Sequence, residues 1–189
     1  MTLLGWESRH MRNKTSRARQ LPFDLGTFLL TTMNIRPIHD TDKTWINRIL
    51  TERWGSTTIV TRGVLHEANE LSGFIAVEGS VPAGLLTYCF DAGACEIVSL
   101  DSLSDGREIG SSLLKSVEQA AKEKGCDRIW LITTNDNLHA LRFYQRRGYV
   151  LVAVYRNAIE RSRQLKPQIP IVGNNGIPLR DEIELEKRL

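Results

Sequence analysis

Three stretches of the sequence combine residue types and spacings that could support chemistry, and the most specific runs from Asn137 to Tyr149. Ala140 and Tyr144 are four residues apart, so they share one face of a helix for which Asn137 is a suitable N-cap. A tyrosine in this setting has two readings. It is a core residue with its hydroxyl at the rim, or a proton donor whose hydroxyl meets a reacting atom.

The second stretch, residues 95–114, reads as an apolar strand, a loop that contains glycine and the start of a helix. The first N–H groups of a helix have no partner within it and point outward, so they suit an anion such as a pyrophosphate. Gly106 and Gly110 would let this backbone approach a ligand closely. An ordinary loop before an ordinary helix would carry the same weak signal.

The third feature is Glu96, an acid within an otherwise apolar strand. Strict alternation would put Glu96, Val98 and Leu100 on one face of that strand. The acid then either faces water or lies in a cleft, where burial would raise its pKa.

Together these features resemble the GNAT acetyltransferase superfamily, over about residues 34–155. The family motif Asn-x-x-Ala-x-x-x-Tyr-x-x-x-Gly-Phe/Tyr is matched by Asn137, Ala140, Tyr144, Gly148 and Tyr149. The resemblance implies a soluble acyltransferase that moves an acetyl group from acetyl-CoA to a primary amine of a small molecule or peptide by direct attack. It implies no metal.

The phosphate loop departs from the family pattern Gln/Arg-x-x-Gly-x-Gly/Ala. Asp105 stands at the Gln/Arg position and Glu108 at the first glycine, while the last glycine is kept as Gly110. Two acids near a pyrophosphate are unfavourable, so the resemblance leaves open a second reading, a CoA-binding module with weak or no catalysis.

The resemblance also assigns roles to particular residues of this chain. It implies Tyr144 as the general acid and Glu96 as the base that receives the amine proton. The residues it implies for acetyl-CoA are the backbone of Leu100, Ser102 and Leu103 for the pantetheine arm, Gly106, Arg107, Gly110 and Ser111 for the pyrophosphate, and Asn137 for the arm.

The elements that must position these residues follow from hydrophobic periodicity and turn signals. We predict helices over residues 42–53, 108–124, 137–147 and 156–165, a loop over 166–178, and strands over 34–38, 57–61, 74–77, 84–90, 95–101, 129–132, 149–155 and 181–185. The β–α–β–α–β order in the middle predicts helices packed on a sheet with at least one parallel pair. With the resemblance, this gives an α/β (α+β) fold with a mixed, mostly antiparallel sheet and one splayed parallel pair.

The acceptor site is predicted only by region, from residues 41–70 and 156–181. These contain Trp45, Trp54, Arg62, His66, Glu67, Glu70, Arg156 and Asn157. Glu67 and Glu70 could attract a cationic amine, although each residue of the set also has a structural reading.

Charge and composition limit the other possibilities. Residues 1–33 hold five of the 25 basic residues and two of the 22 acids, so residues 34–189 carry 20 of each. We expect a basic N-terminal extension over 1–33, one acetyltransferase domain over 34–189, and no nucleic-acid partner for the domain. If the extension were the working part, the chain would instead be a non-enzymatic interaction domain.

Two further expectations concern the chain's surroundings. The sequence has no run of about 18 apolar residues, so we expect no membrane association. The three cysteines stand alone, which favours buried thiols in a reducing, cytoplasmic compartment. Exposed edge strands make a homodimer possible.

Overall fold

The computed structural model describes residues 33–104 and 108–189. The predicted extension lies outside the described residues, apart from Met33, which begins the first strand. The elements are β1 (Met33–Pro37), α1 (Lys43–Trp54), β2 (Thr58–Thr61), β3 (Val64–Glu67), β4 (Ser72–Glu78), β5 (Val81–Asp91), β6 (Ala94–Ser102), α2 (Ile109–Glu123), β7 (Arg128–Thr134), α3 (Leu138–Gln145), β8 (Val150–Tyr155), α4 (Ala158–Leu165) and β9 (Glu182–Arg188), with short 3-10 turns at Asp40–Asp42 and Asn174–Gly176.

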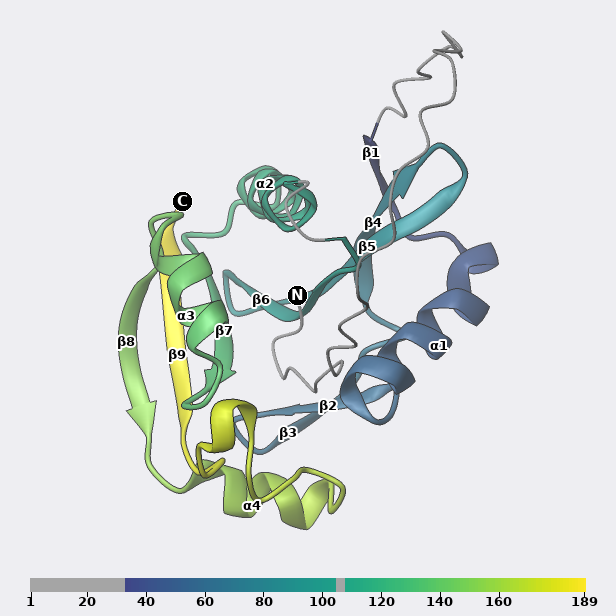
Figure 1. Ribbon diagram of the computed structural model, residues 1–189. Helices are drawn as coiled ribbons and strands as arrows, with labels where there is room; N and C mark the ends of the chain where they lie inside the picture. Colours follow the sequence, from purple (N-terminus) through teal and green to yellow (C-terminus); the bar gives the residue numbers. More distant parts are fainter. Residues whose placement is uncertain (1–32, 105–107) are drawn as a thin grey trace, which may run out of the picture.

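Seven of the strands form one sheet in the order β1-β4-β5-β6-β7-β9-β8 (Figure 1). Neighbouring strands are antiparallel except β6 and β7, which pair in parallel. The predicted mixed α/β fold, mostly antiparallel with a parallel pair, is therefore confirmed. The two edges are β1 and β8.

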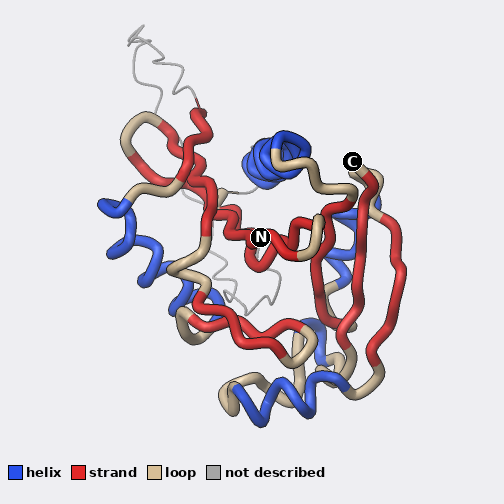
Figure 2. The backbone as a smooth tube through the Cα atoms, turned by 180° about the vertical axis from the view of Figure 1, so that it is seen from behind, coloured by secondary structure: helices blue, strands red, loops and turns tan. Residues whose placement is uncertain are grey.

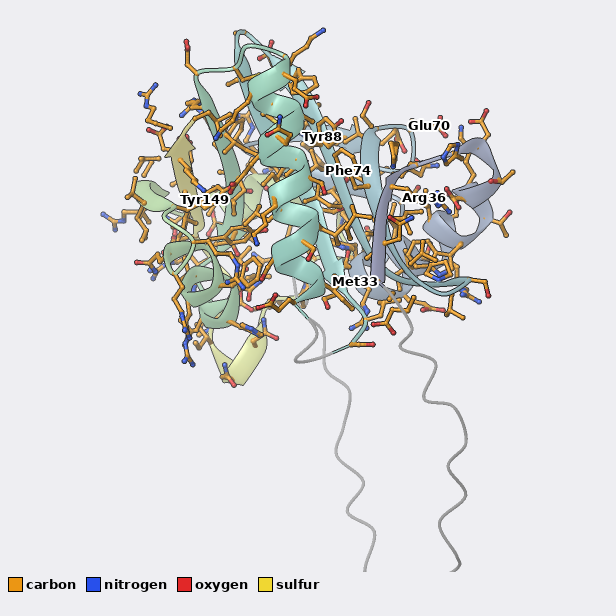
Figure 3. All side chains as sticks on the ribbon, turned by 90° about the horizontal axis from the view of Figure 1, so that it is seen from above. Met33, Arg36, Glu70, Phe74, Tyr88 and Tyr149 are labelled. Carbon is orange, nitrogen blue, oxygen red and sulfur yellow. The ribbon has the colours of Figure 1, made fainter. Side chains whose placement is uncertain are left out.

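The sheet is covered on both faces. Helix α2 lies across β4, β5 and β6, with Tyr149 to one side of it and Phe74 and Tyr88 to the other (Figure 3). The opposite face carries α1 and the hairpin β2–β3, which α4 contacts at β2 (Figure 2). One hydrogen bond from each covering element fixes this second layer on β6: Trp54 of α1 donates to Asp101, and Thr61 of β2 donates to Glu96.

Helix α2 shows why the sequence pattern was readable. Its residues Ile109, Leu113, Leu114 and Val117 recur at helical spacing and are all buried. The chain then leaves the helix at Gly125, whose φ of +76° is open to glycine at no steric cost. These features predicted the helix to within a residue or two at each end.

The hairpin partner β3 was not predicted. Its four residues Val-Leu-His-Glu are exposed or half-buried, so they show no alternation. The turn that joins it to β2 has positive φ at both Arg62 and Gly63, a twist that strand hairpins favour. Arginine is not a usual residue at the first of these positions, so this hairpin has no recognisable turn motif.

Within residues 33–104 and 108–189, no helix is both long and apolar enough to cross a membrane.

Candidate active site

The parallel strands β6 and β7 separate in the middle of the sheet, and the region between their unpaired ends is called the splay below. Their parallel register runs only from Ala94 opposite Arg128 to Ile97 opposite Leu131. Beyond that point β6 continues to Ser102 and β7 to Thr134, but the two strands no longer pair. The β6–β7 ladder therefore ends at Ile97 and Leu131.

A β-bulge on β6 decides which side chains share a face. Tyr88 of β5 pairs with Ile97 and Thr87 pairs with Ser99, so Val98 is the extra residue. After the bulge the alternation is reset. Glu96 therefore shares a face with Ser99 and Asp101, and the prediction that it shares one with Leu100 is wrong.

The backbone of Leu100 and Ser102 is directed into the gap. Leu103 donates its N–H to Ala83 of β5 at 2.9 Å, so its ladder position faces β5. Alternation along an antiparallel pair then turns the N–H and C=O groups of Leu100 and Ser102 away from β5, toward the splay. The N–H of Leu103, the third backbone group predicted for the pantetheine arm, is already engaged.

The residues at the N-terminus of α2 line a cavity that is described below. Gly106 and Arg107, predicted for the pyrophosphate, lie outside the described residues, as does Asp105. Glu108 directly precedes the helix with φ +48° and ψ +11°, a left-handed conformation that glycine adopts without strain. The family pattern has its first glycine at this position, and Glu108 adopts the left-handed conformation in its place.

Gly110 and Ser111 both join α2 to α3. A Cβ on Gly110 would come within 3.2 Å of the Phe143 ring, so the glycine sets how closely the two helices pack. The hydroxyl of Ser111 accepts hydrogen bonds from the guanidinium of Arg147, whose Nε lies 3.2 Å away. Arg147 also stacks on the face of Phe143, 3.6 Å from the ring centroid.

These contacts border an open, strongly basic cavity of about 550 Å³, lined by Glu108, Ser111, Lys115, His139, Arg142, Phe143, Arg146 and Arg147. Four of its lining residues are lysine or arginine and one is an acid. Sequence reasoning singled out none of these basic residues, because they are split between two helices. Spacings of four residues, such as Ser111 to Lys115 and Arg142 to Arg146, put these side chains on one face of each helix. From that spacing the basic residues could have been identified in the sequence.

Tyr144 lies in the last turn of α3, and its ring contacts the rings of Phe143 and Tyr149. The side chain is fully buried and its hydroxyl has no hydrogen-bond partner among the described residues. Burial, together with the nearby charge of Asp101, raises the pKa of this phenol well above its usual range. A buried polar atom without a partner is rare in a folded protein, so this hydroxyl is a candidate for a hydrogen bond to a bound ligand.

Asn137 caps α3, as the sequence predicted. Its Oδ1 accepts the N–H of Ala140 at 3.1 Å. The residue is 4% exposed, and it lies directly after the β7 side of the gap.

Glu96 is buried, which decides between the two readings of this acid. Its Oε1 accepts a 2.7 Å hydrogen bond from the hydroxyl of Thr61. Burial raises the pKa of Glu96, while Thr61, His66 and Arg62 act in the opposite direction. Its burial and raised pKa make Glu96 a candidate for proton transfer.

Thr61 connects Glu96 to His66, whose Nε2 lies 2.9 Å from the same hydroxyl oxygen. An ionised carboxylate can only accept, so Thr61 donates to Glu96 and accepts from His66. That arrangement places the ring hydrogen of His66 on Nε2 and leaves the second lone pair of Thr61 for another donor. His66 appeared in the predicted acceptor region, but nothing in the sequence linked it to Glu96, because the hairpin was missed.

The described residues also include one group with donor atoms suited to a metal ion. His66, Cys89 and Glu96 each offer one such atom, and these atoms lie within 4.8 Å of one another. A cation there would withdraw both His66 and Glu96 from Thr61. Burial raises the pKa of the Cys89 thiol to about 11, which disfavours the thiolate that a metal binds.

Comparison with known proteins identifies the family. Residues 36–149 match the family described as the Acetyltransferase (GNAT) family. The chain belongs to this family. It is 42% identical over 158 residues to the uncharacterized protein YxbD of Bacillus subtilis (strain 168), which spans 83% of this chain and 99% of that protein.

Solved structures share the fold of this GNAT protein. An IAA acetyltransferase from Bacillus cereus ATCC 14579 superposes with a TM-score of 0.65 at 21% identity, over 84% of this chain and 100% of the other. A GNAT family acetyltransferase from Elizabethkingia anophelis, solved with acetyl-CoA bound, superposes with a TM-score of 0.60 at 20% identity, over 83% of this chain and 98% of the other.

A second cavity of about 420 Å³, called the outer cavity below, lies between the end of α1 and residues 166–179. It is lined by Glu52, Arg53, Trp54, Gly55, Asp136, Lys166, Gln168, Ile169, Pro170, Gly173 and Leu179. The loop that closes it is anchored by Asp136, whose Oδ2 accepts both the backbone N–H and the side-chain amide of Asn174. A Cβ on Gly173 would lie 2.2 Å from that oxygen, so only glycine fits there.

An inner cavity of about 20 Å³, room for roughly one water, adjoins the outer one and shares Trp54 and Ile169 with it. Val98 and Ile132 line it, and they directly follow the last paired residues of β6 and β7. Thr61 and Glu182 also line it. This small cavity is thus the floor of the splay, within reach of the Thr61–Glu96 pair.

Several residues of the predicted acceptor set lie elsewhere. Glu70 forms an ion pair with Lys43 of α1 at 2.7 Å, and Glu67 is exposed on the hairpin. Neither lines the outer or the inner cavity, so they do not form the acid-rich entrance that the sequence suggested. Trp54 does line both cavities.

Proposed function

We propose that this protein is an N-acetyltransferase that moves the acetyl group of acetyl-CoA directly to a primary amine. The observation that carries the proposal is a basic cavity at the N-terminus of α2 and a mixed-charge cavity at the end of α1, together with a buried glutamate and a buried tyrosine hydroxyl that has no partner among the described residues. We take the two cavities as the two mouths of one cleft, along the region where β6 and β7 separate.

The residues present fit acetyl-CoA. Lys115, Arg142, Arg146 and Arg147 supply positive charge where the phosphates of CoA would lie, beside the N-terminus of α2. The backbone groups of Leu100 and Ser102 that point away from β5 would accept hydrogen bonds from the amides of the pantetheine arm and donate hydrogen bonds to them. Acetyl-CoA supplies the activated acyl group, a thioester.

The cleft brings two reactants together, which removes much of the entropy cost of their meeting. In the reaction the amine nitrogen forms a bond to the thioester carbonyl carbon, and the carbon–sulfur bond breaks. A backbone N–H of β6 that points into the splay would stabilise negative charge on the carbonyl oxygen.

Tyr144 would serve the leaving group as general acid. Its raised pKa keeps the phenol protonated at neutral pH, so it meets the sulfur as a donor. The positive charge of Arg147 partly opposes the increase in pKa that burial and Asp101 cause. It therefore eases transfer of the proton from the phenol to the departing thiolate.

Glu96 would receive the proton that the amine loses. Thr61 lines the inner cavity and has a lone pair for an incoming N–H, while its own hydrogen points at Glu96. The hydroxyl can therefore take the amine proton as it passes its own to the carboxylate. His66 keeps the hydroxyl in that orientation.

Calorimetric titration with acetyl-CoA and then with free CoA tests the cofactor site first, followed by a screen of primary amines with detection of the released thiol. We expect micromolar binding and thiol release that depends on an amine. Failure to bind up to millimolar concentrations would overturn the proposal.

A CoA-binding module without turnover remains a second candidate, and Glu108 is the observation that favours it. An exposed acid at the N-terminus of α2 opposes the phosphates there. Tight binding of CoA without thiol release on any amine would favour this module.

A further inference from the structure

Two buried charged side chains line the inner and the outer cavity, and their order from the inside outward indicates which kind of acceptor fits. Glu182 lines the inner cavity and is 1% exposed. Its carboxylate accepts hydrogen bonds from the hydroxyl of Ser162 and the backbone N–H of Arg62, both at 2.9 Å. No described basic side chain forms an ion pair with it, since the guanidinium of Arg62 pairs with Glu184 instead.

Lys166 lines the outer cavity and is 3% exposed. Its ammonium donates to two backbone carbonyls, Trp54 O at 2.7 Å and Thr58 O at 2.6 Å. Within residues 33–104 and 108–189 no carboxylate lies within ion-pair distance of it. Two of its three hydrogens are used, and a buried cation satisfied only by neutral oxygens keeps a strong attraction for an anion.

The other charges of the outer cavity do not neutralise Lys166. Asp136 is occupied by the hydroxyl of Thr134 and by both N–H groups of Asn174. Glu52 is exposed and Arg53 half-buried on the last turn of α1. From the floor of the splay outward, the path therefore offers first a buried carboxylate and then a buried ammonium.

We propose that the acceptor is an α-amino acid or a similarly short amino carboxylate, with its amine toward Glu182 and its carboxylate toward Lys166. The inference rests on the proposed acetyl transfer and deepens it. A plain amine would satisfy the inner acid but leave the outer cation without a partner.

The test is a matched comparison of substrates. L-methionine, L-phenylalanine, L-lysine and L-glutamate are each assayed beside the corresponding α-carboxamide, with acetyl-CoA and thiol detection. The two members of a pair have nearly the same size but differ in charge and in amine basicity. The decisive quantity is therefore the change that a variant causes in their ratio of kcat/KM.

In the wild type we expect at least one amino acid to be the better substrate of its pair. Lys166→Met should lower that acid-to-amide ratio about tenfold or more, the usual effect of losing a hydrogen bond to a charged group. Turnover of the amide should be little changed. Lys122→Met, the same substitution at an exposed site near the end of α2, should leave the ratio as it is.

Lys166 also ties the end of α1 to β2, so the fold of the variant needs its own check. Calorimetric binding of acetyl-CoA equal to that of wild type shows that Lys166→Met is folded. Where that variant does not fold, protection of the wild type against heat in the presence of CoA replaces turnover as the readout. Greater protection by the amino acid than by its amide supports the proposal.

The results that overturn it are distinct from failure of the proposed function. Amides preferred over acids, an unchanged ratio in folded Lys166→Met, or an absence of both turnover and protection with all eight compounds would remove this acceptor class. Turnover of other amines with intact acetyl-CoA binding would then leave the acetyltransferase standing.

Discussion

The two mouths of the cleft are built in different ways. The mouth at α2 and α3 is open and basic, and its residues come from two consecutive helices about thirty residues apart in the chain. The mouth at residues 166–179 is more enclosed and of mixed charge, and it joins the end of α1 to a loop more than a hundred residues later. On the proposed function, the first mouth would hold acetyl-CoA and the second would hold the acceptor.

The difference shows where information about function is stored. The first mouth depends on helix termini and on a short motif, which any member of the family can reuse. The second depends on contacts between distant segments, such as Lys166 with Trp54 and Asp136 with Asn174. Changes there would alter the acceptor while leaving the acetyl donor untouched. Lys166→Met tests that side, and four further substitutions test the basic mouth and the two proposed catalytic groups.

Tyr144→Phe should have the largest effect. Loss of the phenol proton removes the acid at the leaving sulfur, so turnover should fall about 10²-fold or more. The affinity for acetyl-CoA should stay close to that of the wild type, because the ring is kept. The hydroxyl has no partner to lose among the described residues, so thermal stability should not decrease. Turnover equal to the wild type would remove Tyr144 from this role.

Glu96→Gln should come next, with a loss of roughly 10- to 10²-fold in kcat/KM near neutral pH. We expect the wild-type rate to rise with pH as Glu96, whose pKa is raised by burial, becomes ionised. The variant lacks this base and depends on acceptor that has already lost its proton. Its deficit should therefore shrink as pH rises toward the pKa of the amine. Parallel pH profiles for the two proteins would argue against Glu96 as base.

Arg147→Met tests the basic mouth alone. Loss of the charge and of the contact with Ser111 should weaken binding of CoA by about tenfold, measured by calorimetry at low salt. Raising the salt concentration should narrow the difference, because screening weakens the charge–phosphate attraction. Lys122→Met serves as the matched control, and kcat at saturating acetyl-CoA should change little.

Glu108→Gly should have the smallest effect, and it is a gain. Glycine relieves the left-handed backbone at this position, worth about 1 kcal/mol in the free energy of unfolding. It also removes an acid beside the phosphates, so CoA should bind a few-fold more tightly. Denaturant unfolding and calorimetry measure the two effects, and weaker binding would mean that Glu108 contributes to the site.

The sequence predicted the elements that have strong periodicity, among them the helix that carries Tyr144, and their order predicted at least one parallel pair. The mostly antiparallel sheet with one splayed pair was implied by the resemblance to the family. Sequence reasoning missed features that depend on geometry without a residue signature. The Val98 bulge reverses the alternation that placed Glu96 with Leu100. The Arg62–Gly63 turn conceals β3 and, with it, the contact of His66 with Thr61.

The acceptor side was the least predictable part of the molecule. Glu67 and Glu70 were chosen because they are acids in the expected region, yet Glu70 pairs with Lys43 on the surface. Glu182 and Lys166 were not singled out, since burial and the lack of a counter-ion are properties of the fold and cannot be read from residue type alone.

The short parallel register between β6 and β7 has a mechanical consequence. Only four register pairs join the half-sheet β1-β4-β5-β6 to the half-sheet β7-β9-β8. Contacts of Glu118 on α2 with Tyr149 and Lys187 bridge the same boundary. A ligand bound between the separated ends of β6 and β7 would contact both half-sheets. Acetyl-CoA would therefore hold the two half-sheets together beside their short β6–β7 register. The folded state would then gain stability in step with the logarithm of ligand concentration.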